Sequence, residues 1–276
     1  MMGTASPLNR LWVDNPAKYV APHGAVFFPN FDNLQGKTQV SRRLVDGQST
    51  AVIVTLGQSN SANYLGYGET PYVASPLVHN FNYLNGGMYL AADPLLGCPG
   101  EYGNYGARLG DLLISRGRFQ RVIIAPIAIN ASLAEHWKDG GIFNQNLRVV
   151  LRRLLAAGLT PTFICYQQGE SDNRIGTSSA SITASLRSMV TTIRAEGVNA
   201  PVFIALTALW PGYSNDAQIR AGQAAAVDHS LGIYQGPDTD TLDAATYRTG
   251  GVHFNAAGAQ AFADLTEQVL AAYLAG

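Results

Sequence analysis

Short runs of hydrophobic residues recur along the chain from residue 51 onward. Each is five or six residues long, rich in β-branched side chains and almost without polar alternation. The four runs are Ala51–Leu56, Arg121–Ala125, Thr162–Tyr166 and Val202–Leu206. Runs of this kind are typical of strands that are buried on both faces of a parallel sheet.

Amphipathic stretches lie between these runs and predict helices. Within residues 144–157, leucines and valines recur at helical spacing, and Gly158 follows as a stop signal. Asn255 is a suitable N-cap for the last helix. The predicted helices are 105–116, 144–157, 178–196, 217–229 and 256–274. Strands that alternate with helices predict βαβ units, hence an α/β domain with a mainly parallel sheet.

Two segments lack a clear period. Residues 1–49 are irregular and proline-rich, with one strand-like run at Ala25–Phe28, and we interpret them as an N-terminal extension that packs on the main domain, residues 50–276. Residues 66–100 are rich in Gly, Pro, Asn and Tyr. They predict a long loop, with a hairpin as an alternative, close to the end of the first strand.

Composition narrows the class of protein. Only 13% of the 276 residues are charged and 47% are hydrophobic, which excludes a disordered chain. The net charge of -1 and the three lysines, Lys18, Lys37 and Lys138, argue against nucleic-acid and polybasic membrane partners. No apolar run could span a bilayer and no leader pattern is visible, so we expect a soluble protein whose compartment and oligomeric state stay open. Cys98 and Cys165 could form at most one disulfide.

Candidate chemistry begins where the first strand ends. Ser59 follows Gly57 and Gln58 there, at the start of the next predicted helix, and ligands bind at carboxyl ends of strands in open parallel sheets. Ser59 is either a nucleophile, with its own N–H facing an oxyanion, or only a helix cap. A serine nucleophile needs a base, and His253 lies in a glycine-rich loop just before the last helix.

Two further segments carry suitable polar groups. Gln168 and Glu170 follow the strand 162–166, where Gln168 can offer an amide N–H₂ to an oxyanion and Glu170 can fix a histidine tautomer. Gly103, before the helix 105–116, can present a backbone N–H. We expect Gln58, Asn60 and Asn104 beside them to contact the substrate.

In this order the segments resemble the SGNH (GDSL-type) hydrolases, and within them the sialate O-acetylesterase-like and acetylxylan esterase-like carbohydrate esterases. The motifs are G-Q-S-N at Gly57–Asn60, Y-x-Q-G-E-S-D at Tyr166–Asp172 and G-x-H-F-x₃-G at Gly251–Gly258. The resemblance starts near residue 51 and implies a three-layer α/β/α, flavodoxin-like fold. It also implies Ser59 as nucleophile and His253 as general base, with an oxyanion hole of the Ser59 N–H, the Gly103 N–H and the Gln168 amide.

The sequence departs from this family in two places. Most members carry Asp three residues before the histidine, where this chain has Gly250. Either Ser59 and His253 act as a dyad helped by a backbone carbonyl, or another acid orients His253; Glu170 is the first candidate, with Asp172 and Asp243 behind it. A structural role for Glu170 is equally open. The second departure is Asn130-Ala131-Ser132, where the branch often has a Gly-Gly-Thr/Ser turn before a Trp, here Trp137.

The resemblance implies an esterase that removes a small acyl group, such as acetyl, from a carbohydrate without a metal or cofactor. The alternatives are a lipase or thioesterase, or a glycan-binding or surface interaction module that has the same fold but no activity. Loop aromatics either stack on a sugar or pack in the core. They are Tyr64, Tyr67, Tyr72, Phe81, Tyr83, Tyr89, Tyr102 and Tyr105.

Overall fold

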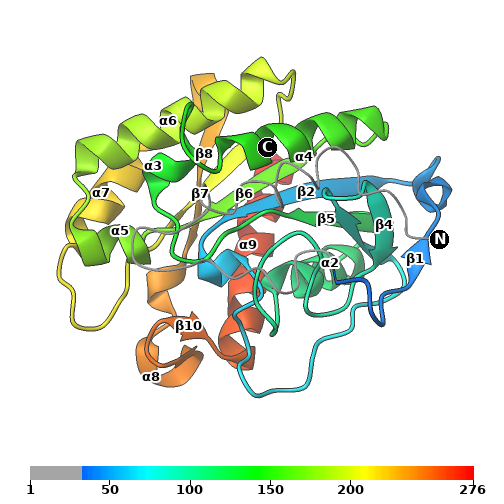
Figure 1. Cartoon of the computed structure of the whole chain (residues 1–276), viewed down its shortest axis with the longest axis horizontal. Coiled ribbons are helices and arrows are strands. Elements are labelled where there is room, and N and C mark those ends of the chain that lie inside the picture. Colours follow the sequence, from blue (N-terminus) through cyan, green and yellow to red (C-terminus); the bar gives the residue numbers. More distant parts are fainter. Residues whose placement is uncertain (1–32) are drawn as a thin grey trace.

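The computed structural model describes residues 33–276, so the strand-like run at Ala25–Phe28 and Lys18 lie outside the described residues. A sheet in the order β1-β4-β3-β5-β2-β6-β7-β8 forms the centre of the molecule (Figure 1). The pairs that join β3, β5, β2, β6, β7 and β8 are parallel, whereas β4 runs antiparallel to both β3 and β1. The predicted α/β class with a mainly parallel sheet is confirmed.

The strands predicted from the hydrophobic runs are all present. They form β2 (Thr50–Gly57), β5 (Arg121–Pro126), β6 (Phe163–Gln167) and β7 (Val202–Leu206). The aperiodic segment 66–100 contains the hairpin of β3 (Val78–Asn82) and β4 (Gly87–Leu90). Two strands of this sheet were not predicted from the sequence: β8 (Ile233–Asp238), whose run is interrupted by polar residues and glycine, and the two-residue β1 (Gln39–Val40).

Helices cover both faces of the sheet, which gives three layers (Figure 1). On one face lie α3 (Ala134–Trp137), α4 (Asn144–Ala156), α6 (Ser179–Ala195) and α7 (Asp216–Ala226). The other face carries α2 (Tyr105–Ser115) and α9 (Ala256–Ala275), with Asn255 as the predicted N-cap of α9. Each face of the sheet therefore has its own hydrophobic core, as the almost uninterrupted apolar strands require.

Short elements complete the chain. They are α5 (Glu170–Ile175), α8 (Ala244–Tyr247), β9 (Arg248–Thr249), β10 (His253–Phe254) and the 3₁₀ turns η2 (Arg42–Val45), η3 (Ser59–Ser61), η4 (His229–Leu231) and η5 (Thr239–Thr241). Residues 33–49 of the expected N-terminal extension bring β1 to the edge of the sheet beside β4. No helix within residues 33–276 has both the length and the apolar character needed to cross a membrane.

The order of the strands places the site. β2 lies between β5 and β6, and the chain turns to one side of β2 first and to the other side later. Such a switch point leaves a crevice at the carboxyl end of the strand, where ligands bind in sheets of this type.

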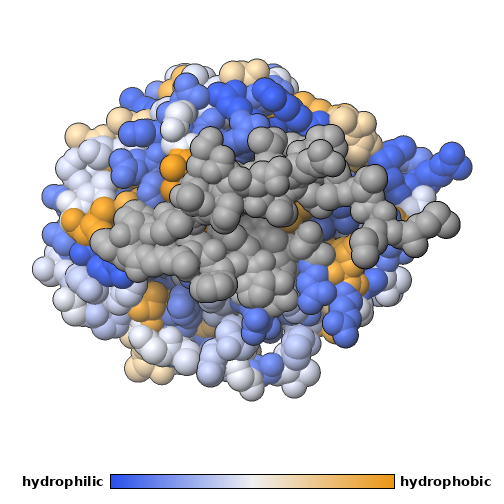
Figure 2. Space-filling model, viewed as in Figure 1, coloured by the Kyte–Doolittle hydropathy of each residue, from blue (hydrophilic) through white to orange (hydrophobic). Residues whose placement is uncertain are grey.

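On the face shown in Figure 2, outside the grey atoms, hydrophobic side chains form small patches among hydrophilic ones.

Candidate active site

The carboxyl end of β2 is locked against β6. Gly57 has a φ of +131°, and a Cβ at this position would overlap the Gln167 carbonyl, so only glycine fits. The Gln58 N–H donates to the same Gln167 carbonyl at 3.1 Å, and the Ser171 N–H donates to Gln58 Oε1 at 3.0 Å. The first and middle sequence motifs therefore lie against each other.

Ser59 begins the 3₁₀ turn η3, not the α-helix expected from the sequence. The helix is absent at this point because Ala62 returns at once to an extended conformation, with φ -103° and ψ -164°. Ser59 is only 5% exposed. Among residues 33–276, neither its hydroxyl nor its N–H has a hydrogen-bond partner, so both remain available for a ligand.

Asn60 connects Ser59 to the loop that carries His253. Its Nδ2 donates to the Val252 carbonyl at 3.1 Å, and its Oδ1 accepts from the Phe254 N–H at 3.2 Å. These two partners are the residues before and after His253. A single side chain next to Ser59 thus holds the histidine backbone from both sides.

His253 lies on a tight hairpin, in which β10 pairs with β9 through the register His253↔Thr249. Gly250 (φ +62°) and Gly251 (φ +76°) form the turn, and a Cβ on Gly251 would lie 2.8 Å from the Pro211 side chain. The left-handed conformation favours glycine at position 250, where the sequence analysis noted the absence of an Asp.

Arg248, which lies in β9, stabilises this hairpin through its side chain. The guanidinium is fully buried and donates to the carbonyls of Val252 (2.9 Å), Leu242 (2.9 Å) and Thr239 (2.8 Å). It also lies over the Phe254 ring, with its Cζ 4.4 Å from the centroid. These contacts fix the backbone of the hairpin that carries His253.

The His253 ring is half-buried and stacks on Tyr64, with 5.7 Å between the ring centroids. It makes no hydrogen bond to any of residues 33–276, Ser59 and Glu170 included. Burial lowers the pKa of His253, the Glu170 carboxylate raises it and the Arg248 guanidinium lowers it further. The neutral imidazole is the form that this environment favours.

Glu170 does not orient the His253 ring directly, which corrects the first candidate for the missing acid. The carboxylate is fully buried; it accepts hydrogen bonds from Asn60 Nδ2 and Gln167 Nε2 at 2.7 Å each, and from the Gly169 N–H at 3.2 Å. Because Asn60 holds both neighbours of His253, Glu170 acts on the histidine through Asn60.

The carboxylates of the two other acid candidates, Asp172 and Asp243, are hydrogen-bonded to groups other than His253. Asp172 is buried and accepts from the Ala134 N–H, Gln168 Nε2 and Thr177 Oγ1, and burial raises its pKa to about 6. Asp243 caps the short helix α8. Among residues 33–276, no carboxylate is hydrogen-bonded to His253.

Gln168 lies in a buried network behind the carboxyl end of β2. Its Oε1 accepts from Ser132 Oγ at 2.6 Å and from Trp137 Nε1 at 3.1 Å, while its Nε2 donates to Asp172 Oδ2 at 2.9 Å. Ser132 also lies 3.1 Å from the Gly57 carbonyl. One of the two Gln168 amide hydrogens remains without an acceptor among the described residues.

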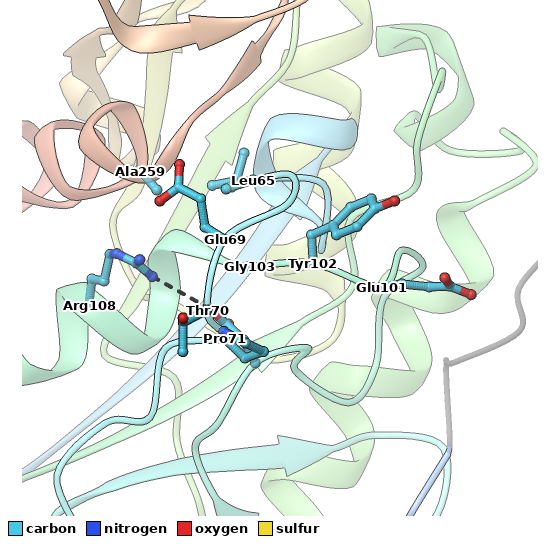
Figure 3. A pocket seen from close by; sticks show the side chains of 11 residues that line it. Leu65, Glu69, Thr70, Pro71, Glu101, Tyr102, Gly103, Arg108 and Ala259 are labelled. Carbon is cyan, nitrogen blue, oxygen red and sulfur yellow. Dashed lines mark hydrogen bonds and ion pairs between the residues drawn. The ribbon is translucent and has the colours of Figure 1, made fainter.

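The Gly103 N–H is not available as an oxyanion donor, contrary to the expectation from the sequence. It donates to the Leu65 carbonyl at 2.7 Å, in a bridge that also joins the Leu65 N–H to the Gly103 carbonyl. Gly103 instead lines a small pocket beside Glu69, Tyr102 and Arg108 (Figure 3). This pocket, about 30 Å³, has room for one water molecule rather than a substrate.

Two of the three residues expected to contact the substrate are structural. Asn60 is fully buried with both amide atoms bonded, as described above. Asn104 is also fully buried; it caps α2 through the Gly106 N–H at 2.8 Å and donates to the Ser61 carbonyl at 3.2 Å. Gln58 differs, because its Nε2 has no acceptor among residues 33–276.

The loop after β5 contains Asn130-Ala131-Ser132, which the sequence marked as a departure from the family without assigning any hydrogen-bond donor to it. It lies against β2, since the Ile129 N–H donates to the Gly57 carbonyl at 3.0 Å. Ala131 has a φ of +55°, the one positive φ of a non-glycine residue among residues 33–276. Neither the Asn130 nor the Ala131 N–H has an acceptor there. The strand pattern could have indicated this loop, since it follows β5, which adjoins β2 in the sheet. A strained backbone such as that of Ala131 is typical of functional sites.

Of the eight loop aromatics, four are buried in the core and four lie at or near the surface. Tyr67 is 61% exposed and packs edge-on against Tyr102, with 4.7 Å between the centroids, and Tyr64 stacks on His253. Tyr72 donates to Asp111 and lies beside Arg108. The remaining four are buried packing residues: Phe81, Tyr83, Tyr89 and Tyr105. Among residues 33–276, no group of three His, Cys, Asp or Glu side chains is placed to hold a metal ion.

The structure resembles solved proteins, although no protein-family model and no curated protein matches the sequence. A protein from Arabidopsis thaliana has a TM-score of 0.64 at 15% identity, over 83% of this chain and 99% of that one. A carbohydrate acetylesterase from Xanthomonas citri has 0.56 at 17%, over 79% of this chain, which spans 55% of that protein. A GDSL-like lipase from Parabacteroides merdae has 0.51 at 11%, over 80% and 95%. At these identities the likeness concerns the fold.

Proposed function

We propose that this chain, whose fold is that of the SGNH (GDSL-type) hydrolases, is a serine esterase that removes O-acetyl or other small acyl groups from a carbohydrate. One observation carries the proposal most directly. Asn60, the neighbour of Ser59, is hydrogen-bonded to both residues that flank His253, which supports a site where the Ser59 hydroxyl and the His253 imidazole act on one substrate at the carboxyl end of β2.

The proposed reaction is acyl transfer through a covalent intermediate. His253 takes the proton of the Ser59 hydroxyl as the oxygen attacks the ester carbonyl, and later returns it to the departing sugar hydroxyl. Water then attacks the acyl-enzyme, with His253 again as the base, and releases the acid. A hydroxyl–imidazole hydrogen bond absent without substrate is compatible with this role, because such contacts often tighten only when substrate binds.

Oxyanion stabilisation falls to donors that have no acceptor among the described residues. The Ser59 N–H is one, and the N–H groups of Asn130 and Ala131 replace that of Gly103. Gln168 contributes its remaining amide hydrogen. Each such donor is worth about 3 kcal/mol of transition-state stabilisation in serine hydrolases.

A non-catalytic glycan-binding module is the second candidate. The observation that favours it is the His253 ring, which has no carboxylate partner among residues 33–276 to stabilise an imidazolium. In the esterase proposal, the rigid hairpin on Arg248 and Asn60 replaces the orienting acid, and the imidazolium faces the Glu170 carboxylate at longer range.

A panel of esters separates the candidates. The purified protein is incubated with p-nitrophenyl acetate, acetylated xylan, an O-acetylated sialic acid and p-nitrophenyl esters of longer acids, and released acid is measured. We expect hydrolysis of the acetyl esters of sugars and a steep decline with acyl length. Preference for long acyl chains would favour a lipase, and glycan binding without release of acetate would favour the binding module.

The activity should extend to lower pH than a histidine base with its ordinary pKa would allow. His253 must be neutral to act as a base, and burial lowers its pKa, so the acid limb of the kcat/KM profile should fall below the ordinary histidine value of about 6.5. Glu170→Gln removes the group that raises this pKa and should move the limb to still lower pH. An acid limb above pH 6.5 in the unmutated protein would contradict the assignment of His253 as the base.

A further inference from the structure

Hydrogen bonds fix the backbone on both sides of His253, but they do not fix its ring. Asn60 holds the two neighbouring residues, whereas the imidazole makes no hydrogen bond within residues 33–276. A general base has to present one particular ring nitrogen to the serine hydroxyl, so the plane of the ring needs a support. In a Ser-His-Asp triad the carboxylate provides this support.

Tyr64 is the one aromatic residue in the described part of the chain whose ring contacts this imidazole. The two ring centroids are 5.7 Å apart and the ring planes differ by 25°. This is the offset-stacked arrangement that aromatic pairs favour. The stack restricts rotation of the imidazole, because a ring turned out of this plane would drive its edge into the tyrosine.

The ring of Tyr64 packs among small side chains. It is half-buried and contacts the cluster of Ala62, Cys98 and Ala128. Gly100 lies against it as well, since a Cβ at Gly100 would be 3.1 Å from Tyr64 Cδ2. Small residues at these four positions leave the room that an aromatic ring needs beside His253.

The backbone around Tyr64 is tied to the hairpin of His253. The N–H groups of the residues before and after Tyr64 donate to carbonyls of the loop 99–103, at 3.0 and 3.1 Å. The Gly66 N–H donates to the carbonyl of Phe254, the residue after His253, at 2.9 Å. A main-chain hydrogen bond therefore joins the two segments beside the stacked rings and holds them at a fixed separation.

We propose that Tyr64 is a positioning residue for the reaction, whose ring fixes the plane of the His253 imidazole as a carboxylate does in a triad. This inference rests on the proposed esterase function and deepens it. The face of an aromatic ring also attracts a cation, so the contact strengthens when His253 accepts the proton of Ser59. Neither effect needs the tyrosine hydroxyl. Burial raises the pKa of Tyr64 to about 12, so the ring is a neutral phenol near neutral pH.

The test replaces Tyr64 by Leu and by Phe, and measures hydrolysis of p-nitrophenyl acetate and of an acetylated sugar. Tyr64→Leu removes the stacked ring and should lower kcat by about 10-fold for both esters, with KM within about threefold of wild type. Tyr64→Phe keeps the ring and should retain kcat within about threefold. The melting temperature of each variant is measured by circular dichroism, and activity is assayed well below it.

Tyr234→Leu is the matched control. Tyr234 stacks on His229 with 4.7 Å between the centroids and 26° between the planes, so this variant also removes a tyrosine from a histidine. Tyr234 lies near the start of β8, whereas the proposed site lies at the carboxyl ends of the parallel strands. It should keep wild-type kcat with both esters. A similar loss of kcat in Tyr234→Leu would show that the loss in Tyr64→Leu is one of general stability.

Nuclear magnetic resonance provides a readout that does not depend on activity. The protein is labelled with ¹³C at the histidine Cε1 atoms, and the signal of His253 is identified by its absence in His253→Asn. Because a stacked ring shifts the resonances of its neighbour, this signal should move in Tyr64→Leu. It should stay near its wild-type position in Tyr64→Phe and in Tyr234→Leu.

Three kinetic results would overturn the inference. Equal losses of kcat in Tyr64→Leu and Tyr64→Phe would mean that the hydroxyl matters and not the ring. A rise in KM confined to the acetylated sugar would make Tyr64 a sugar-binding residue, and an unchanged kcat in Tyr64→Leu would remove it from the reaction. If wild type hydrolyses neither ester, the esterase proposal fails by itself. The resonance of His253 then decides whether Tyr64 fixes the ring: a shift in Tyr64→Leu alone supports this, and an unmoved signal contradicts it.

Discussion

Ser59→Ala should abolish hydrolysis of p-nitrophenyl acetate and of acetylated sugars, with kcat reduced by about 10⁴-fold or more. The reason is chemical, because alanine has no oxygen to form the acyl-enzyme, and residual rate would come only from the oxyanion donors. Initial rates under saturating ester, with a blank for spontaneous hydrolysis, measure the effect.

The fold should survive this change. The Ser59 hydroxyl makes no hydrogen bond among the described residues, so its removal breaks none of them, and we expect the free energy of unfolding to change by less than about 1 kcal/mol. Ser61→Ala is the matched control, since Ser61 ends the same turn η3 and is also buried. It should stay within a few-fold of wild-type activity. Undiminished hydrolysis by Ser59→Ala would remove Ser59 from the mechanism.

Asn60→Ala should have the second largest effect, on both activity and stability. The change removes the hydrogen bonds to Glu170, Val252 and Phe254, and leaves the Phe254 N–H buried without its partner. We expect a loss of about 2–4 kcal/mol in the free energy of unfolding. We also expect kcat to fall by about 10²-fold, because a shift of the His253 backbone of only about 1 Å misaligns the base.

Asn80→Ala separates the two effects. Asn80 is a buried asparagine on β3, with hydrogen bonds to both the N–H and the carbonyl of Leu96 and to the Ile124 carbonyl. It should lose comparable stability while keeping kcat when assayed well below its melting temperature. Equal kcat losses in both variants would show that Asn60 matters only for general stability.

The pattern of apolar runs was sufficient to predict the four central strands and five of the helices. The strands are short, almost uninterrupted apolar runs, and the helices carry apolar residues at helical spacing, so both patterns can be recognised locally. β8 was not predicted, because Gln235, Gly236 and Pro237 interrupt its apolar run and its place in the sheet depends on pairing with β7. The helix expected at Ser59 was also wrong, since the chain makes a single 3₁₀ turn there and becomes extended at Ala62.

The motifs located three chain segments correctly, but not the atoms that each presents. Gly103 and Asn104 were expected to face the substrate, yet their polar groups are already hydrogen-bonded. The Gly103 N–H bonds to Leu65, and the Asn104 side chain bonds to Gly106 and Ser61. Glu170 was expected to orient the imidazole, but it bonds to Asn60, Gln167 and the Gly169 N–H. A motif records which residue types are present, whereas hydrogen bonds that saturate a buried group depend on neighbours far away in the chain.

The sequence by itself thus determined the α/β architecture, and the edge of the sheet where chemistry is expected, because hydrophobic periodicity and glycine positions are local properties. Only the tertiary structure decided which donors are free among the described residues, that the loop 129–132 bonds to Gly57 at the end of β2, and that Gly250 forms a tight turn in the left-handed region just before His253. The physical reason is that a polar group is available for catalysis only when no partner has already bound it, and those partners come from strands brought together by the fold.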